Sequence, residues 1–139
     1  MVKTFVFKAY QSKKNKKLHH LIDVAASLYN HCISAHEEHY RLSGKRLNKY
    51  DLQKSLTSLK RSGDYSFLNI LNSQVVQDAT DRIDRGYSLF YTSKKNKTKR
   101  TIRPPSYKKA SKYKSITFKQ SGYAFLEGNR IRIGKDIYK

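Results

Sequence analysis

Alternation of apolar and polar positions at both ends of the sequence predicts β-strands. Apolar side chains in "TFVFKAY" recur at every second position from Phe5 to Ala9, which predicts a strand within residues 1–10. Near the other end, "SITFK" at 115–119 alternates in the same way, and "YAFLEGNRIRIG" predicts a hairpin that turns at 127–129. We therefore expect the chain to begin and end in β-structure.

Between these ends, apolar residues recur at steps of three and four, the spacing of amphipathic helices. The first helix is expected over roughly 14–42, with Gly44 at the position of a left-handed C-cap. The second is expected to begin after Asn48, a good N-cap residue, and the third after Asn72 or Ser73. Three such helices can close a small bundle.

The order of strand, helices and strands predicts an α+β fold in which the bundle is inserted between paired terminal strands. A lone strand is marginal in water, so the N-terminal strand is expected to pair with the C-terminal ones. We expect an N-terminal strand unit, a helical unit, a basic connector and a C-terminal strand unit, which cover residues 1–10, 11–93, 94–114 and 115–139.

The charge balance points to a polyanionic partner. The 139 residues carry a net charge of +20, with a sequence pI near 10.1. Nucleic acid is the expected polyanion, because the densest charge lies in a Pro-containing, non-periodic stretch, whereas an anionic membrane surface favours a basic amphipathic helix. No apolar run approaches the roughly 18 residues of a membrane span, and the N-terminus is too short and polar for a signal peptide. A cytoplasmic location follows. The single cysteine, Cys32, excludes an internal disulfide and makes a zinc site improbable.

The connector 94–114 holds ten of the thirty basic residues and no acid. Pro104 and Pro105 keep it out of helix. We expect an extended arm whose lysines neutralise phosphates while its two tyrosines stack on bases or sugars. Its candidate contact residues are Tyr107, Lys108, Lys109, Lys112, Tyr113 and Lys114. A disordered, solvated linker is the alternative.

A second basic cluster opens the first helix, where Lys13, Lys14, Lys16 and Lys17 follow one another closely. Cations at a helix N-terminus oppose the helix dipole and cost about 0.3–1 kcal/mol each at low salt. A phosphate bound there would offset that cost, since helix N-termini present free amides to anions. Lysines that simply extend into water are the alternative interpretation.

Asp78, Asp81 and Asp84 suggest a metal-dependent nuclease, but their spacing argues against it. At 3.6 residues per turn they spread around one helix and do not converge. Arg82 and Arg85 follow Asp78 and Asp81 at i+4, which predicts ion pairs on a solvated face. The histidines form no ligand set, and no nucleophile or phosphate-loop motif is present, so no catalytic centre, metal or cofactor is expected in this chain.

Several segments together resemble the N-terminal part of the TnpB (OrfB) proteins of bacterial insertion sequences. They are "FKAYQSKKNKKL", "LYNHCI", "SGKRLNKYDLQKSLTSLKR", "LNSQVVQDATDRIDRGYSLFY", "PPSYKK" and "SITFK", with "GNRIRI" after them. The resemblance covers essentially the whole chain, with Gln11 in place of a usual proline and Val76-Gln77 in place of a leucine-glutamine pair.

The resemblance implies RNA-guided DNA nucleases related to type V CRISPR effectors. These have a wedge β-barrel interrupted by a helical recognition domain, followed by a RuvC-like nuclease domain. By that likeness, this chain is a recognition bundle in a partial wedge, a non-catalytic part that binds guide RNA and double-stranded DNA near the bacterial nucleoid. The nuclease domain, separate or downstream, would follow Lys139 and supply the Mg²⁺-binding carboxylates.

The resemblance also implies residue roles. Gln77 corresponds to a glutamine that reads the DNA motif next to the target, and Thr117 to a wedge threonine beside the same duplex. Neighbouring contacts fall at Lys49, Tyr50 and Ser73. Glutamine can bond an adenine edge through two hydrogen bonds, and hydroxyls reach phosphates or bases.

Two other functions stay open from the sequence. One is a stand-alone DNA-binding accessory protein of an insertion sequence, similar to a helix-turn-helix protein, which binds without RNA. The other is an enzyme in its own right, which would require the three aspartates of the third helix to bind Mg²⁺.

Overall fold

The computed structural model describes residues 1–97 and 100–139, and its secondary structure is α+β, as expected from the sequence. Thr98 and Lys99, which belong to the predicted connector, lie outside the described residues. The helices are α1 (Asn15–Ser43), α2 (Lys49–Arg61), the 3-10 helix η1 (Gly63–Ile70) and α3 (Ser73–Asn96). Two short 3-10 turns, η2 (Ala110–Lys112) and η3 (Gln120–Gly122), precede the strands β1 (Tyr123–Leu126), β2 (Arg130–Ile133) and β3 (Asp136–Tyr138).

The helix boundaries follow the predicted caps. Gly44 ends α1 with a φ of 67°, in the left-handed region that glycine adopts without steric cost. The side chain of Asn48 caps α2 by accepting a hydrogen bond from the backbone N–H of Tyr50 at 2.8 Å. Asn72 caps α3 in the same way, which leaves the neighbouring Ser73 side chain free of that role.

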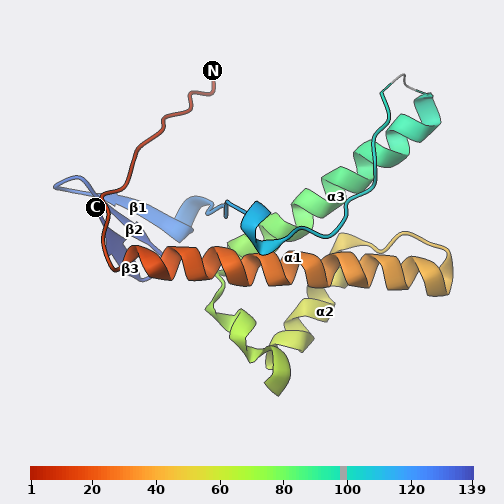
Figure 1. Cartoon of the computed structure of the whole chain (residues 1–139), viewed down its shortest axis with the longest axis horizontal. Coiled ribbons are helices and arrows are strands. Elements are labelled where there is room, and N and C mark those ends of the chain that lie inside the picture. Colours follow the sequence, from red (N-terminus) through yellow and green to blue (C-terminus); the bar gives the residue numbers. More distant parts are fainter. Residues whose placement is uncertain (98–99) are drawn as a thin grey trace.

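One apolar core joins the helices. Its largest fully buried apolar side chains come from α1, α2, η1 and α3; they are Leu28, Ile33, Leu52, Leu56, Leu68 and Ile83. Burial of each such side chain contributes about 1.5–3 kcal/mol. In Figure 1, α2 and η1 lie below α1, while the C-terminal half of α3 rises above it. Among the described residues, no helix is both long and apolar enough to cross a bilayer.

The three strands form an antiparallel sheet in the order β1-β2-β3. The predicted hairpin between β1 and β2 is confirmed, and Gly128 and Asn129 adopt the positive φ values of 70° and 56° that its turn requires. The sheet lies beside the N-terminal end of α1 (Figure 1), where Lys17 of α1 pairs with Asp136 of β3 at 3.2 Å.

The strand predicted within residues 1–10 is wrong. These residues have no strand structure and all are exposed, including Phe5 and Phe7. Alternation requires a ladder partner and a covered face to become a strand. Within the described residues, the backbone of 1–10 forms one hydrogen bond with the C-terminal segment, from the Tyr10 N–H to the Lys139 carbonyl at 2.8 Å.

The strand predicted at 115–119 is also wrong, because side chains of α3 bind its backbone in place of a neighbouring strand. Arg82 donates to the Ser115 carbonyl at 3.2 Å, and the Lys119 N–H donates to Gln74 Oε1 at 2.7 Å. The apolar side chains Ile116 and Phe118 pack against the helical core. Residues 115–119 are therefore an extended strap on α3.

Candidate nucleic-acid interface

Residues 94–96 of the predicted connector continue α3, so the helical unit ends three residues later than predicted. The connector is extended over residues 101–109, as predicted, and there it is anchored to α1 and α3. Asn30 binds both backbone groups of Lys108, since its Nδ2 donates to the carbonyl at 2.8 Å and its Oδ1 accepts from the N–H at 2.9 Å. Tyr107 Oη lies 2.8 Å from Ser34 Oγ and donates to Glu37 Oε2 at 3.2 Å. A disordered linker therefore does not describe this part of the connector.

The connector also contacts α3 closely at Gly86. A Cβ built on this residue would lie 2.7 Å from Cγ of Pro105, too close for a real side chain. The missing side chain therefore admits the proline ring to the helix surface. In Figure 1 the connector returns from the far end of α3 toward the middle of α1.

Tyr113 corrects the predicted role of the connector tyrosines. Its side chain is only 4% exposed and packs on the Tyr29 ring, with centroids 5.6 Å apart. The Arg82 guanidinium lies 5.7 Å from the centroid of the Tyr113 ring. Burial raises the pKa of Tyr113. A ring buried in this way cannot stack on a base, whereas Tyr107 remains 54% exposed.

The connector lysines present their charge to solvent. Lys108, Lys109, Lys112 and Lys114 are all exposed, and within the described residues none of them forms an ion pair with an acid. The ammonium of Lys108 lies 5.2 Å from the Tyr29 ring centroid. Exposed cations without acidic partners are suited to phosphate contacts.

The lysines at the start of α1 are exposed as well, and the first turn of that helix contains no acid. Two of them also hold the sheet. Lys17 pairs with Asp136, and the Lys14 ammonium lies 5.7 Å from the Tyr138 ring centroid. The side chains of Lys13 and Lys16 make no such contact within the described residues.

On α3, Ser73 and Gln77 are exposed one turn apart, and Asp81 follows one turn later on the same side of the helix. The Asp81 carboxylate binds Lys49 Nζ at 3.2 Å and Lys119 Nζ at 3.5 Å. The hydrogen bond and the charge of Asp81 both raise the pKa of Lys49, which keeps this lysine protonated.

Tyr50 extends the same cluster, because the Lys49 ammonium lies 5.3 Å from its ring centroid and the ring is 64% exposed. Asp81 therefore places Lys49, with Tyr50 beside it, one turn of α3 from Gln77. Lys49, Tyr50 and Gln77 were all singled out from the sequence. Lys119 joins them, although no local sequence signal marks it.

Thr117 lies on the flank of this cluster and is partly buried. Its Oγ1 accepts a hydrogen bond from Arg82 at 3.1 Å. The same arginine pairs with Asp78 at 2.7 Å, so it fastens the strap 115–119 to α3. The sequence predicted the pair of Arg82 with Asp78 but placed it on a solvated face, and Asp78 is in fact only 6% exposed.

The three aspartates of α3 bind different cations. Asp78 binds Arg82, Asp81 binds two lysines, and Asp84 binds Arg46 at 2.6 Å. The predicted pair of Arg85 with Asp81 is replaced by these lysine contacts. Residues 1–97 and 100–139 contain no group of three histidine, cysteine or acidic side chains that could hold a metal ion.

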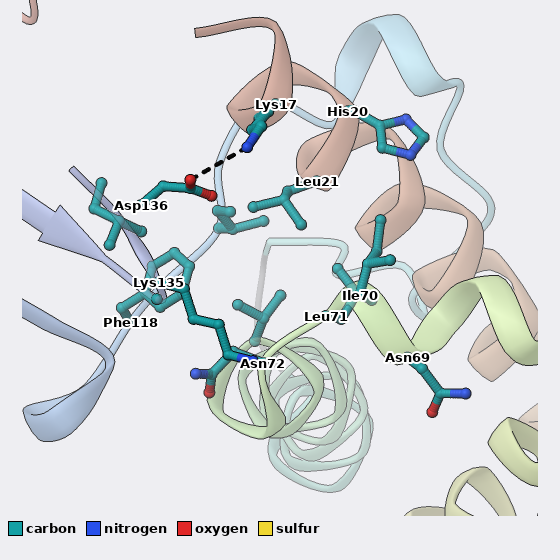
Figure 2. A pocket seen from close by; sticks show the side chains of 14 residues that line it. Lys17, His20, Leu21, Asn69, Ile70, Leu71, Asn72, Phe118, Lys135 and Asp136 are labelled. Atoms are coloured by element: carbon teal, nitrogen blue, oxygen red, sulfur yellow. Dashed lines mark hydrogen bonds and ion pairs between the residues drawn. The ribbon is translucent and has the colours of Figure 1, made fainter. Parts of the chain in front are cut away.

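The cavity of about 520 Å³ in Figure 2 lies where the sheet meets the helices. Apolar side chains such as Leu21, Leu71 and Phe118 line it, and Lys17, paired with Asp136, lies at its edge. The polar side chains Asn69 and Asn72 are already used, one on the Lys60 carbonyl and one as a helix cap. His20 of α1 and Lys135 of the turn before β3 complete its polar lining, and both are exposed.

No family model matches the sequence, and no curated protein matches it at a significant level. The likeness to TnpB proteins therefore rests on the sequence segments alone.

Proposed function

We propose that this chain is a nucleic-acid-binding protein that holds RNA and an adjacent DNA duplex through its anchored connector and the exposed side of α3. One observation carries this proposal. The backbone of the connector is fixed by Asn30, Tyr107, Tyr113 and Pro105, and none of its lysines is paired with an acid within the described residues, so the backbone that carries four exposed cations is preordered for phosphate binding.

The DNA contact is assigned to the cluster around Gln77. Gln77 is exposed and lies one turn of α3 before Asp81, which binds two lysines. The exposed Ser73 lies one turn before Gln77. Lysines would hold the phosphates while the glutamine amide reads a base edge, a pairing worth about 1–3 kcal/mol of discrimination.

The likeness to TnpB proteins gives this proposal its more specific form. The helices would be a recognition bundle inserted into a partial wedge barrel, with guide RNA as the first partner and a RuvC-like nuclease, separate or downstream, as the source of Mg²⁺-dependent cleavage. The bond between Tyr10 and Lys139 supports the insertion, because it joins the segment before α1 to the end of the sheet. The binding of each α3 aspartate to a cation supports a non-catalytic role for this chain.

Competition binding tests the proposal. A labelled structured RNA bound to the chain is displaced by unlabelled RNA or by duplex DNA at matched salt. A clear preference for structured RNA supports the RNA-guided form, and equal displacement supports the stand-alone DNA-binding alternative. Failure to bind either polymer at low salt would refute nucleic-acid binding.

Gln77→Ala tests whether the Gln77 side chain recognises a base of the DNA motif. The variant should fold and bind RNA like the wild type, while its preference among duplexes that differ in the adjacent motif becomes flat. Ser55→Ala, at an exposed position of α2, is the control. An equal loss on every duplex would make Gln77 a phosphate or structural contact.

A further inference from the structure

A second cavity, of about 280 Å³, lies between the C-terminal parts of α1 and α3. Figure 1 shows these two helices diverging toward their C-terminal ends. Side chains of both helices, of the loop between α1 and α2, and of the proline pair in the connector line this cavity. None of its lining residues belongs to the candidate contacts of the nucleic-acid interface.

The walls of this cavity are aromatic. Tyr87 and Tyr91 lie with their rings nearly parallel, at 25° and 6.4 Å between centroids, and Phe90 contacts Tyr91 at 5.3 Å. Tyr91 is 39% exposed, so part of the stack remains accessible. Such a surface is suited to a flat aromatic ligand.

Two cations accompany these rings. The Arg46 guanidinium lies 6.0 Å from the Tyr87 centroid and 5.9 Å from that of Tyr91, and the Lys94 ammonium lies 4.7 Å from the centroid of Phe90. Arg46 is already paired with Asp84, whereas Lys94 forms no ion pair within the described residues. The lining also contains one acid, Glu37, whose Oε2 accepts a hydrogen bond from Tyr107 at 3.2 Å. The two cations on the rings outnumber it, so the cavity favours an aromatic ligand that carries negative charge over a cationic one.

His36 adds an unused polar group to the lining. It is only 4% exposed, its ring lies 4.9 Å from that of Tyr87, and its buried Nε2 has no hydrogen-bond partner among the described residues. Buried polar atoms are nearly always bonded, so an unpartnered one beside a cavity indicates a missing partner. Burial, followed by the nearby Arg46, lowers the pKa of His36 and favours the neutral ring, which can donate or accept at Nε2.

We propose that this cavity holds one unpaired nucleobase of the bound nucleic acid, stacked on Tyr91, with its phosphate on Lys94. The inference rests on the proposed nucleic-acid binding and adds a site for an unstacked base. The volume fits one ring system, since it is smaller than the roughly 300–1,000 Å³ of pockets for larger ligands. Unpaired bases in RNA are commonly bound by stacking on aromatic side chains.

The test compares two RNA hairpins that differ by one bulged 2-aminopurine, a fluorescent base whose emission falls on stacking. Wild-type protein should bind the bulged hairpin on the order of 10-fold more tightly than the fully paired one, with quenched emission. Tyr91→Leu should remove the preference and the quenching but leave the affinity for the paired hairpin unchanged. Tyr123→Leu is the matched control, because this tyrosine is 37% exposed on β1, outside the cavity.

The outcomes separate the two proposals. Equal binding of both hairpins by the wild type, or a preference that survives Tyr91→Leu, overturns the base site while nucleic-acid binding stands. Binding of neither hairpin overturns both. Circular dichroism checks that Tyr91→Leu is folded, which is expected because Tyr91 lies outside the buried core.

Discussion

Removal of the Asn30 side chain should release the connector without weakening the helical core. Its amide forms two hydrogen bonds with the backbone of Lys108, at 2.8 and 2.9 Å, across 78 positions of sequence. Alanine at this position removes both bonds. It also has a higher helix propensity than asparagine, so α1 itself should gain slightly.

The magnitude follows from these two hydrogen bonds. A hydrogen bond contributes about 0.5–1.5 kcal/mol net, and Lys108 is exposed, so water replaces part of what is removed. We expect docking of the connector to weaken by about 1–2 kcal/mol in total. If nucleic acid binds the docked connector, its affinity should fall by up to about 5- to 30-fold.

Two measurements check this prediction for Asn30→Ala. Hydrogen exchange should speed up at the amides of residues 108–113, and fluorescence anisotropy should show weaker binding with an unchanged salt slope, because no charge is removed. Asn69→Ala is the matched control, since Asn69 also donates to a backbone carbonyl, that of Lys60 at 2.9 Å, away from the connector. Unchanged exchange and affinity, or a shallower salt slope, would refute the reasoning.

Three further predictions concern the packing around the connector and the core. Gly86→Ala should stabilise α3 by up to about 1 kcal/mol through its higher helix propensity, but the new methyl group should displace Pro105. Crosslinking between α3 and the connector should therefore fall, and a wild-type yield of crosslinks would contradict the close contact. Folding lowers the pKa of His36, so the unfolded chain binds more protons than the folded protein below pH 6.5. The free energy of unfolding should therefore fall as the pH drops below 6.5. Denaturant titrations of His36→Gln should lack this part of the pH dependence. Burial raises the pKa of Cys32 to about 12, so iodoacetamide at pH 8 should modify it only as the protein unfolds; rapid modification of the folded protein would disprove this.

The helices could be predicted because their signals are local. Apolar spacing places the buried face of each helix, and Gly44, Asn48 and Asn72 mark boundaries through their own backbone or side-chain chemistry. The strands at 1–10 and 115–119 were predicted wrongly because alternation describes one face of a segment and not its partner. Arg82 and Gln74 occupy the backbone of 115–119, which no local pattern reveals.

Composition and spacing predicted only the charge of the site, and Gln77, Lys49 and Tyr50 were named through the resemblance to TnpB proteins. The lysines of the connector and of the α1 start are exposed, as their composition indicated. The position of Tyr113 was not predictable, because its burial depends on Tyr29 and Arg82, far away in the sequence. The clamp by Asn30 and the binding of Lys119 by Asp81 are nonlocal for the same reason.

The salt dependence of binding tests the central claim most directly. Replacement of Lys108, Lys109, Lys112 and Lys114 by alanine should weaken binding of RNA and DNA alike. It should make the slope of log affinity against log salt shallower by up to about 0.7–0.9 for each phosphate that the connector no longer neutralises. A slope equal to that of the wild type would contradict the account, because the connector would then neutralise no phosphates.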